Sequence, residues 1–268
     1  MSLTFDIKSA SSIDYAHSCA AMLDTIVQSQ PRVQCITNSV AMDFSSDVLL
    51  AIGARISLTL GKEEIQEFVA NCNSLCVNIG TLNVTRKIVI EPAIESALYY
   101  HRPWVLDPVS VHISKTRCQY ARMLLEYNPS VIRGNVAEIK ALVGRDTPDA
   151  PWILAQETGA IVAQTGQSDI ITDGNQALMI TNGHSMQTRV TAMGCAATAL
   201  ISAFITTNRR PFDTTVEALL AFSIAGELAV KKSQGPGSLH THILDTLYHL
   251  DKQTLEQHAH ILSCSEVC

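Results

Sequence analysis

The segment Thr191-Ala-Met-Gly-Cys195 is the part of this 268-residue chain best suited to chemistry. A turn of small residues leads directly into an apolar helix predicted over residues 194–207. The first turn of a helix leaves N–H groups without partners, and the helix dipole adds positive potential there, so Gly194 marks a candidate anion site. A thiol at such a point is expected to have a lowered pKa, which singles out Cys195. The alternative interpretation is a turn that only packs a core helix.

Two carboxylates follow buried strands upstream of this turn. Asp107 comes directly after the strand predicted over residues 104–106, at the edge of the sheet where α/β proteins bind ligands. Glu138 lies three residues after Asn135, a spacing typical of a capping box at a helix start. Asp107 and Glu138 are also suited to a magnesium ion, because Mg²⁺ keeps several waters and needs few protein ligands.

Helix capping does not explain Arg133, a charged residue beside a glycine at the end of a buried strand. The planar guanidinium of arginine matches phosphate oxygens. Thr165-Gly166 ends a further strand and offers a hydroxyl group and an open backbone. These residues therefore indicate contacts to a phosphate-containing ligand.

The elements that must position these residues alternate in hydrophobic period along the first half of the chain. Strands are predicted at residues 33–36, 55–60, 74–79, 104–106 and 131–132, and helices at residues 14–29, 40–53, 62–72, 84–101, 115–127 and from about 135. This alternation is typical of a mostly parallel sheet with helices on both faces. The predicted fold class is therefore α/β, with three layers in the order α/β/α.

The second half of the chain changes character. Short strands are predicted at residues 160–164, 169–172 and 177–181, separated by turn dipeptides such as Asp173-Gly174, so this part of the sheet is expected to be antiparallel. Helices follow at residues 194–207, 213–232 and 239–258. Without a repeat or linker in the sequence, we expect a single domain over residues 1–268, with a frayed tail after about residue 253.

Composition excludes several classes of protein. Hydrophobic residues make up 47% and charged residues 16%, which excludes a disordered chain and a coiled coil. The net charge of −6 argues against a nucleic-acid partner, and no apolar run is long enough for a membrane span. The eight cysteines form no CxxC pair, and the chain begins without a signal-peptide pattern, so we expect free thiols in a cytoplasmic protein.

Eight short motifs occur in order along the chain. They are Cys-Ile-Thr-Asn at 35–38, Asn-Ile-Gly-Thr-Leu at 78–82, Leu-Asp-Pro-Val at 106–109, Ile-Arg-Gly-Asn-x-x-Glu-Ile at 132–139, Thr-Gly-x-x-Asp at 165–169, Thr-Asp-Gly at 172–174, Gly-Cys at 194–195 and Gly-Pro-Gly-Ser at 235–238. With these motifs the chain resembles the hydroxyethylthiazole kinase family, of the ribokinase-like fold, over about residues 10 to 250.

The resemblance implies phosphoryl transfer from Mg-ATP to the primary alcohol of the hydroxyethylthiazole 4-methyl-5-(2-hydroxyethyl)thiazole, in thiazole salvage for thiamine biosynthesis. It also implies a homotrimer with active sites at the subunit interfaces. By motif, the catalytic residue is Cys195, the ATP contacts are Arg133, Thr165 and Gly194, the thiazole contacts are Leu58, Ala192 and Asn38, and the magnesium ligands are Asp107 and Glu138. Whether Cys195 acts as a base or only positions the hydroxyl is left open.

The chain departs from the family around the path of the phosphates. Ala192 stands where the family usually has glycine, and its methyl group would clash if that residue needs a positive φ. Met193 adds bulk beside it, residues 110–114 replace a glycine-rich stretch, and Gln167 removes a charge.

These departures leave two alternatives open. One is another small-alcohol kinase of the same fold, acting on a pyrimidine methanol or a sugar. The other is a catalytically impaired homologue that binds the thiazole or the nucleotide. The apolar side chains of Val40, Met42 and Leu58 in the expected pocket favour a thiazole over a sugar.

Overall fold

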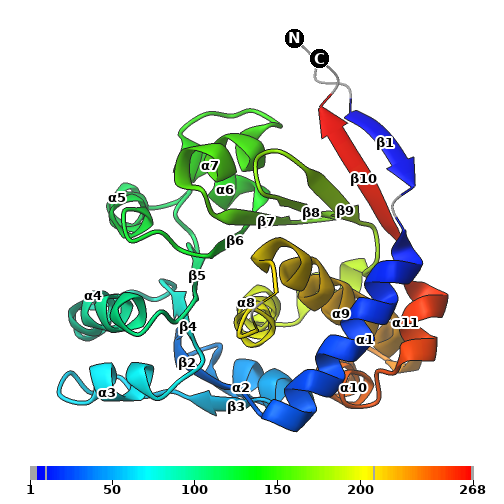
Figure 1. The fold of residues 1–268 in the computed structure, drawn as a ribbon, viewed down its shortest axis with the longest axis horizontal. Helices are drawn as coiled ribbons and strands as arrows, with labels where there is room; N and C mark the ends of the chain where they lie inside the picture. The colour runs from blue at the N-terminus through cyan, green and yellow to red at the C-terminus, as the bar shows by residue number, and fades with distance from the viewer. Residues whose placement is uncertain (1–4, 10, 208, 267–268) are drawn as a thin grey trace.

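A single mixed sheet forms the centre of the computed structural model, which describes residues 5–9, 11–207 and 209–266 (Figure 1). Within these residues the strand order is β1-β10-β9-β8-β7-β6-β5-β4-β2-β3. The strands are β1 (Phe5–Ser9), β2 (Arg32–Ile36), β3 (Arg55–Ser57), β4 (Ser74–Asn78), β5 (Trp104–Asp107), β6 (Val131–Asn135), β7 (Ile161–Thr165), β8 (Asp169–Thr172), β9 (Ala177–Ile180) and β10 (Ile261–Glu266). Neighbouring strands from β3 to β7 pair in parallel, and those from β7 to β1 pair antiparallel.

Helices cover both faces of the sheet. They are α1 (Ser12–Ser29), α2 (Met42–Ala51), α3 (Ile65–Ala70), α4 (Val84–Tyr99), α5 (Lys115–Leu125), α6 (Val136–Val143), α7 (Ala150–Thr158), α8 (Met193–Phe204), α9 (Pro211–Lys232), α10 (Pro236–Tyr248) and α11 (Lys252–His258), with a short 3-10 helix η1 (Ser185–Arg189). In Figure 1, α3 to α7 lie on one side of the sheet, and α8, α9 and α1 lie on the other.

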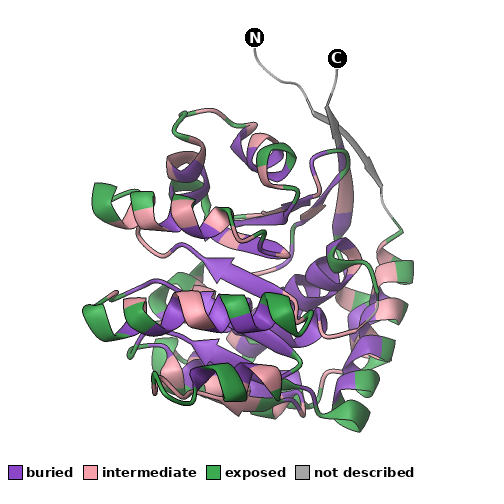
Figure 2. Cartoon of the chain, turned by 60° about the vertical axis from the view of Figure 1, so that its left-hand side comes forward, coloured by how far each residue is buried: buried purple, intermediate pink, exposed green. Residues whose placement is uncertain are grey.

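Side-chain alternation along the strands divides the core in two. In β4, Cys76 packs into the core cluster that includes α1, α8 and α9, whereas Leu75 and Val77 pack into the cluster under α3 to α7. The strands β4, β5 and β7 are buried at every residue, as expected for parallel strands covered on both faces (Figure 2). The predicted three-layer α/β/α class is therefore confirmed.

The helix α8 is buried at every residue from Ala196 to Phe204. It packs against α2 and α9 and against the strands β2, β4 and β5. Because the helix is apolar on all sides, the sheet and its neighbouring helices fix its axis, and its first turn is held at the edge of the sheet. None of the described helices combines the length and the apolar character that crossing a membrane requires.

The C-terminal region differs from the prediction. We expected a frayed tail after about residue 253, but α11 continues to His258, and β10 pairs antiparallel with both β9 and β1. The helix predicted over residues 239–258 is divided in two, because Asp251 caps α11 by accepting a hydrogen bond from the Thr254 N–H at 2.8 Å. A strand that pairs only with distant segments leaves little local signal in the sequence.

The helix α7 was not predicted. Pro151 occupies its first turn, where a missing N–H costs nothing and the fixed φ suits a helix. The strand predicted over residues 55–60 is shorter than expected and ends at Ser57.

Candidate active site

The carboxyl ends of the parallel strands meet at one edge of the sheet and carry polar side chains. Asn78 is the last residue of β4, Asp107 the last of β5 and Thr165 the last of β7, while Asn38 lies just after β2. All four are buried. The first turn of α8, with Gly194 and Cys195, reaches the same place, since Cys195 bonds to Asn38 and Thr198 bonds to Asp107.

A chain of side-chain hydrogen bonds joins Cys195 to Asp107. Asn38 Nδ2 donates to Cys195 Sγ at 3.3 Å and to Asn78 Oδ1 at 3.1 Å. Asn78 Nδ2 then donates to Asp107 Oδ2 at 2.6 Å. The hydroxyl of Thr198, one turn along α8 from Cys195, lies 3.0 Å from the same oxygen. The structure therefore brings together three residues that the sequence assigned to catalysis, thiazole and metal.

Asp107 is fully buried, and one of its oxygens has no protein partner. Oδ2 accepts from Asn78 and Thr198, but nothing in the described part of the chain bonds to Oδ1. Burial raises the pKa of this carboxyl to about 6, against the opposing charge of Arg133, and the neighbouring Glu138 raises it further. A buried carboxylate oxygen without a partner fits a cation, which would supply the missing interaction.

Glu138 performs the predicted capping role and a second one. Its Oε2 accepts from the Asn135 N–H at 2.8 Å, and Asn135 caps Glu138 N in return. Its Oε1 accepts from the Ser110 N–H at 2.7 Å, which fastens the loop after β5. No cluster of three or more His, Cys, Asp or Glu side chains suited to a metal occurs among the described residues. A magnesium ion at this place would therefore depend on these two carboxylates, water and a phosphate-bearing ligand.

The three predicted ATP contacts lie against one another. The Arg133 guanidinium donates from Nη2 to the Thr165 hydroxyl. A Cβ atom added at Gly194 would lie 2.8 Å from Arg133 Nη2, so a larger residue would displace the guanidinium from its present position. Arg133 Nε is buried and has no hydrogen-bond partner among the described residues. The cation therefore retains a donor for an anionic ligand beside the first turn of α8.

Two of the departures noted in the sequence occupy strained backbone. Ala192, the residue before α8, has φ +65°, and Ser110 has φ +60°. A left-handed conformation costs a residue with a Cβ about 1–2 kcal/mol. The positive φ suspected at residue 192 is therefore real, and the chain accommodates it with an alanine.

The pKa expected for Cys195 is wrong in direction. The helix start was expected to lower it, but burial and the charge of Asp107 raise it to about 12, against hydrogen bonds from Asn38 and Asn78. Desolvation of the thiolate outweighs the helix dipole here. The thiol of the ligand-free protein therefore stays protonated near neutral pH.

The residues expected to line an apolar pocket lie near the free edge of the parallel half of the sheet. Leu58 follows the edge strand β3, and it packs on the same core cluster as Ala192 and Met193. Val40, which donates its N–H to Asn38 Oδ1 at 3.1 Å, is 59% exposed. Met42 is half-buried at the start of α2.

Asn78, Thr198 and Arg86 also lie at the candidate site, since the first two bond to Asp107 and Arg86 donates to the Asn78 carbonyl, but the sequence analysis assigned them no role. Asn78 carries the same signal as Asp107, a polar residue at the end of a buried strand, and could have been found by it. Thr198 lies inside an apolar helix, and Arg86 lies in the first turn of another helix, where charged residues are common. Neither type of position distinguishes a site residue.

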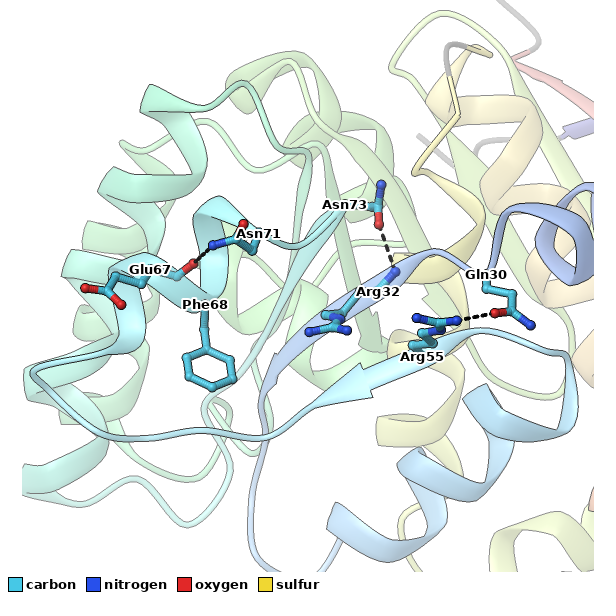
Figure 3. A pocket seen from close by; sticks show the side chains of 7 residues that line it. All are labelled: Gln30, Arg32, Arg55, Glu67, Phe68, Asn71 and Asn73. Carbon is cyan, nitrogen blue, oxygen red and sulfur yellow. Dashed lines mark hydrogen bonds between the residues drawn. The ribbon is translucent and has the colours of Figure 1, made fainter.

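A hollow of about 530 Å³ lies at the other end of the strands from the Asp107 cluster, near the amino ends of β2 and β3 (Figure 3). Its lining residues are Gln30, Arg32, Arg55, Glu67, Phe68, Asn71 and Asn73. Arg55 donates to Gln30, and the backbone N–H of Arg32 donates to Asn73 Oδ1 at 2.8 Å. The hollow shares no residue with the cluster around Asp107.

Comparisons with known proteins agree with the motifs. The sequence model of the hydroxyethylthiazole kinase family matches residues 23–253. The hydroxyethylthiazole kinase of Cereibacter sphaeroides is 40% identical over 257 residues, which are 91% of this chain and 98% of that protein.

Solved structures agree as well. The hydroxyethylthiazole kinase of Pyrococcus horikoshii OT3 superposes with a TM-score of 0.89 at 31% identity, covering 92% of this chain and 99% of that one. A ribokinase-like superfamily protein of Enterococcus faecalis V583 has a TM-score of 0.66 at 12% identity, covering 91% of this chain and 96% of that one, which supports the same fold.

Proposed function

The chain belongs to the hydroxyethylthiazole kinase family, and we propose that it transfers the γ-phosphoryl group of ATP to the primary alcohol of 4-methyl-5-(2-hydroxyethyl)thiazole. The activity is that of a kinase in thiazole salvage for thiamine biosynthesis. The observation that carries the proposal is the start of α8, where Gly194 lies against the Arg133 guanidinium and Cys195 accepts a hydrogen bond from Asn38. We assign the first pair to the phosphate side of the site and the second to the alcohol side.

The phosphate side consists of Arg133, Thr165 and Gly194. The guanidinium bonds to the threonine hydroxyl and keeps Nε free, and it lies against a glycine at a helix start. Such an arrangement offers several donors to the phosphates of ATP without any movement of the backbone. We assign the binding of the ATP phosphates to these three residues.

The alcohol side consists of Asn38 and Cys195. Their hydrogen bond of 3.3 Å fixes the thiol beside the first N–H groups of α8, where the transferred phosphoryl group would pass. Because the thiol pKa is raised to about 12, Cys195 fits a role in orienting the alcohol better than a role as a base. Phosphoryl transfer through a loose transition state depends mainly on positioning and requires little early deprotonation. Leu58 and Ala192 would complete the thiazole side of the pocket.

The residues present fit a magnesium ion at Asp107 and Glu138. The fit rests on the free Oδ1 of Asp107, buried beside a second carboxylate. When bound with ATP, such an ion supplies charge neutralisation for the phosphate oxygens. The chain's own contribution is to hold Asp107 through Asn78 and Thr198, so that the free oxygen keeps its direction.

Other features of the proposal extend beyond a single chain. We assign the enzyme to a homotrimer with its active sites at the subunit interfaces, which agrees with the 59% exposure of Val40 beside Asn38.

We also assign it to the cytoplasm, where the seven described cysteines, all free, would stay reduced. Cys268 lies outside the described residues.

A panel of alcohols tests the substrate. When the hydroxyethylthiazole is the acceptor, purified protein with Mg-ATP should form ADP and the phosphate ester of the thiazole alcohol. ADP should form far more slowly when the acceptor is a pyrimidine methanol or a sugar. Faster turnover of either alternative would assign the enzyme to that alcohol. ATP binding without turnover of any of the three would indicate a catalytically impaired homologue, for which the strain at Ala192 would be the structural reason.

A further inference from the structure

Arg86 is a buried cation at the candidate site, and the proposed function gives it no role. It lies in the first turn of α4 and is 4% exposed. Its Nη1 donates to the backbone carbonyl of Gly80, and its Nη2 donates to those of Asn78 and, at 3.4 Å, Ile36. The guanidinium therefore holds the carboxyl ends of two neighbouring strands, β2 and β4, with one planar group.

The position of these carbonyls explains why an arginine is required. The ladder between β2 and β4 ends at the pair Ile36 and Val77. Carbonyls that leave a ladder inside the protein need new donors. A guanidinium with donors in a fixed fork can reach both strands at once, which a lysine with a single donor atom cannot do.

The arrangement is costly, because the charge has no acidic partner. Among the described residues, no carboxylate forms an ion pair with Arg86. Its Nε is buried without a partner, and burial lowers the pKa of the guanidinium. An unpaired buried charge carries a penalty of several kcal/mol. Arg86 therefore stands at a position where a charge without an acidic partner is unfavourable for stability, although its hydrogen bonds hold two strands.

The held segment lies directly beneath the alcohol side of the site. Gly80 donates its N–H to Asn78 Oδ1 at 2.9 Å, and a Cβ added at Gly80 would lie 3.1 Å from that oxygen and 3.2 Å from Asn38 Nδ2. Any shift of the Asn78–Gly80 backbone would therefore displace both amides. Asn38 and Asn78 in turn bond to Cys195 and Asp107.

We propose that Arg86 is a positioning residue for phosphoryl transfer. It fixes the Asn78–Gly80 turn, and through Asn78 and Asn38 it sets the placement of Asp107 and Cys195 around the acceptor alcohol. The proposal rests on the proposed kinase function and adds a residue to it.

Steady-state kinetics of two variants test this role. In Arg86→Lys the charge remains but the two strands are no longer bridged, and in Arg86→Met both features are lost. Arg102→Met is the matched control, because Arg102 also donates to a backbone carbonyl, that of Ala70 at 3.2 Å, and also has a buried Nε without a partner, but it precedes β5 at the opposite edge of the sheet.

We expect kcat to fall about 10- to 100-fold in Arg86→Met, less in Arg86→Lys, and less than about twofold in the control, with KM for both substrates nearly unchanged. Circular dichroism and thermal unfolding establish that each variant is folded. If Arg86→Met does not fold, Arg86→Lys decides the question. A folded lysine variant with the kcat of the wild type would overturn the proposal, as would equal losses in the control. A wild-type protein without transfer activity would instead overturn the proposed function, and this role with it.

Discussion

Replacing Asp107 by asparagine should stabilise the ligand-free protein at neutral pH and abolish its function. Asparagine keeps an oxygen that can accept from Asn78 and Thr198, as Asp107 Oδ2 does, but carries no charge. The cost of burying the carboxylate is thereby removed. A gain in stability at the expense of activity is expected where a site holds a charge ready for a ligand.

The magnitude follows from the pKa of the carboxyl. Burial raises it from 3.8 to about 6, a difference of about two units, and each unit corresponds to 1.36 kcal/mol. Because the pKa in the folded state lies above that of the unfolded state, stability is retained below pH 4 and is lost as the pH rises to 6. Above pH 6 the charged carboxyl therefore lowers the free energy of unfolding by about 3 kcal/mol. The asparagine variant does not lose this stability.

Urea unfolding in EDTA between pH 4.5 and 8 measures this difference. The stability of Asp107→Asn relative to the wild type should increase with pH up to about 6 and then stay constant. Burial also raises the pKa of Asp169 to about 6, but this contribution is the same in both proteins and cancels. Asp24→Asn, at an exposed position on α1, serves as the control for the loss of one carboxylate from the surface. Parallel stability curves for the wild type and Asp107→Asn would refute the reasoning.

Four further substitutions, at three positions, test the start of α8. Ala192→Gly relieves the strained φ of +65° and should raise the melting temperature by about 2–4 °C, as measured by calorimetry, while a decrease would show that the alanine is not strained. Gly194→Ala places a Cβ against the Arg133 guanidinium and should raise KM for ATP about tenfold or more; an unchanged KM would separate Arg133 from the nucleotide. Cys195→Ala should slow turnover, but Cys195→Ser, which keeps a polar hydrogen, should restore part of kcat if the thiol orients the alcohol.

Polar residues that end buried strands were the sequence signal for the candidate site. Asp107, Arg133 and Thr165 all have this signal, and the structure places Arg133 against Thr165 with Asp107 within reach of its charge. Such a residue stands out because parallel strands are otherwise apolar on both faces. The cooperating residue Thr198 does not stand out, because its hydroxyl is hidden in an apolar helix.

The remaining differences between the sequence predictions and the structure depend on contacts between segments that are distant in the sequence. The direction of the Cys195 pKa is set by burial and by Asp107, which lies far away in the sequence, whereas the helix start is a local feature. The strand β10 exists because it pairs with β9 and β1, about 80 and 250 residues away in the chain. The position of Arg86 in a first helical turn is local, but its acceptors come from the ends of two other elements.

The most direct test of the central claim is a single-turnover experiment with the hydroxyethylthiazole, Mg-ATP and excess enzyme, followed by mass spectrometry of the thiazole. We predict that the wild type adds one phosphoryl group to the side-chain alcohol. Gly194→Ala alters the start of α8 and Asp107→Asn alters the carboxylate beside it, so both variants should form the ester far more slowly. An unmodified thiazole with the folded wild type, or equal ester formation by all three proteins, would contradict the account.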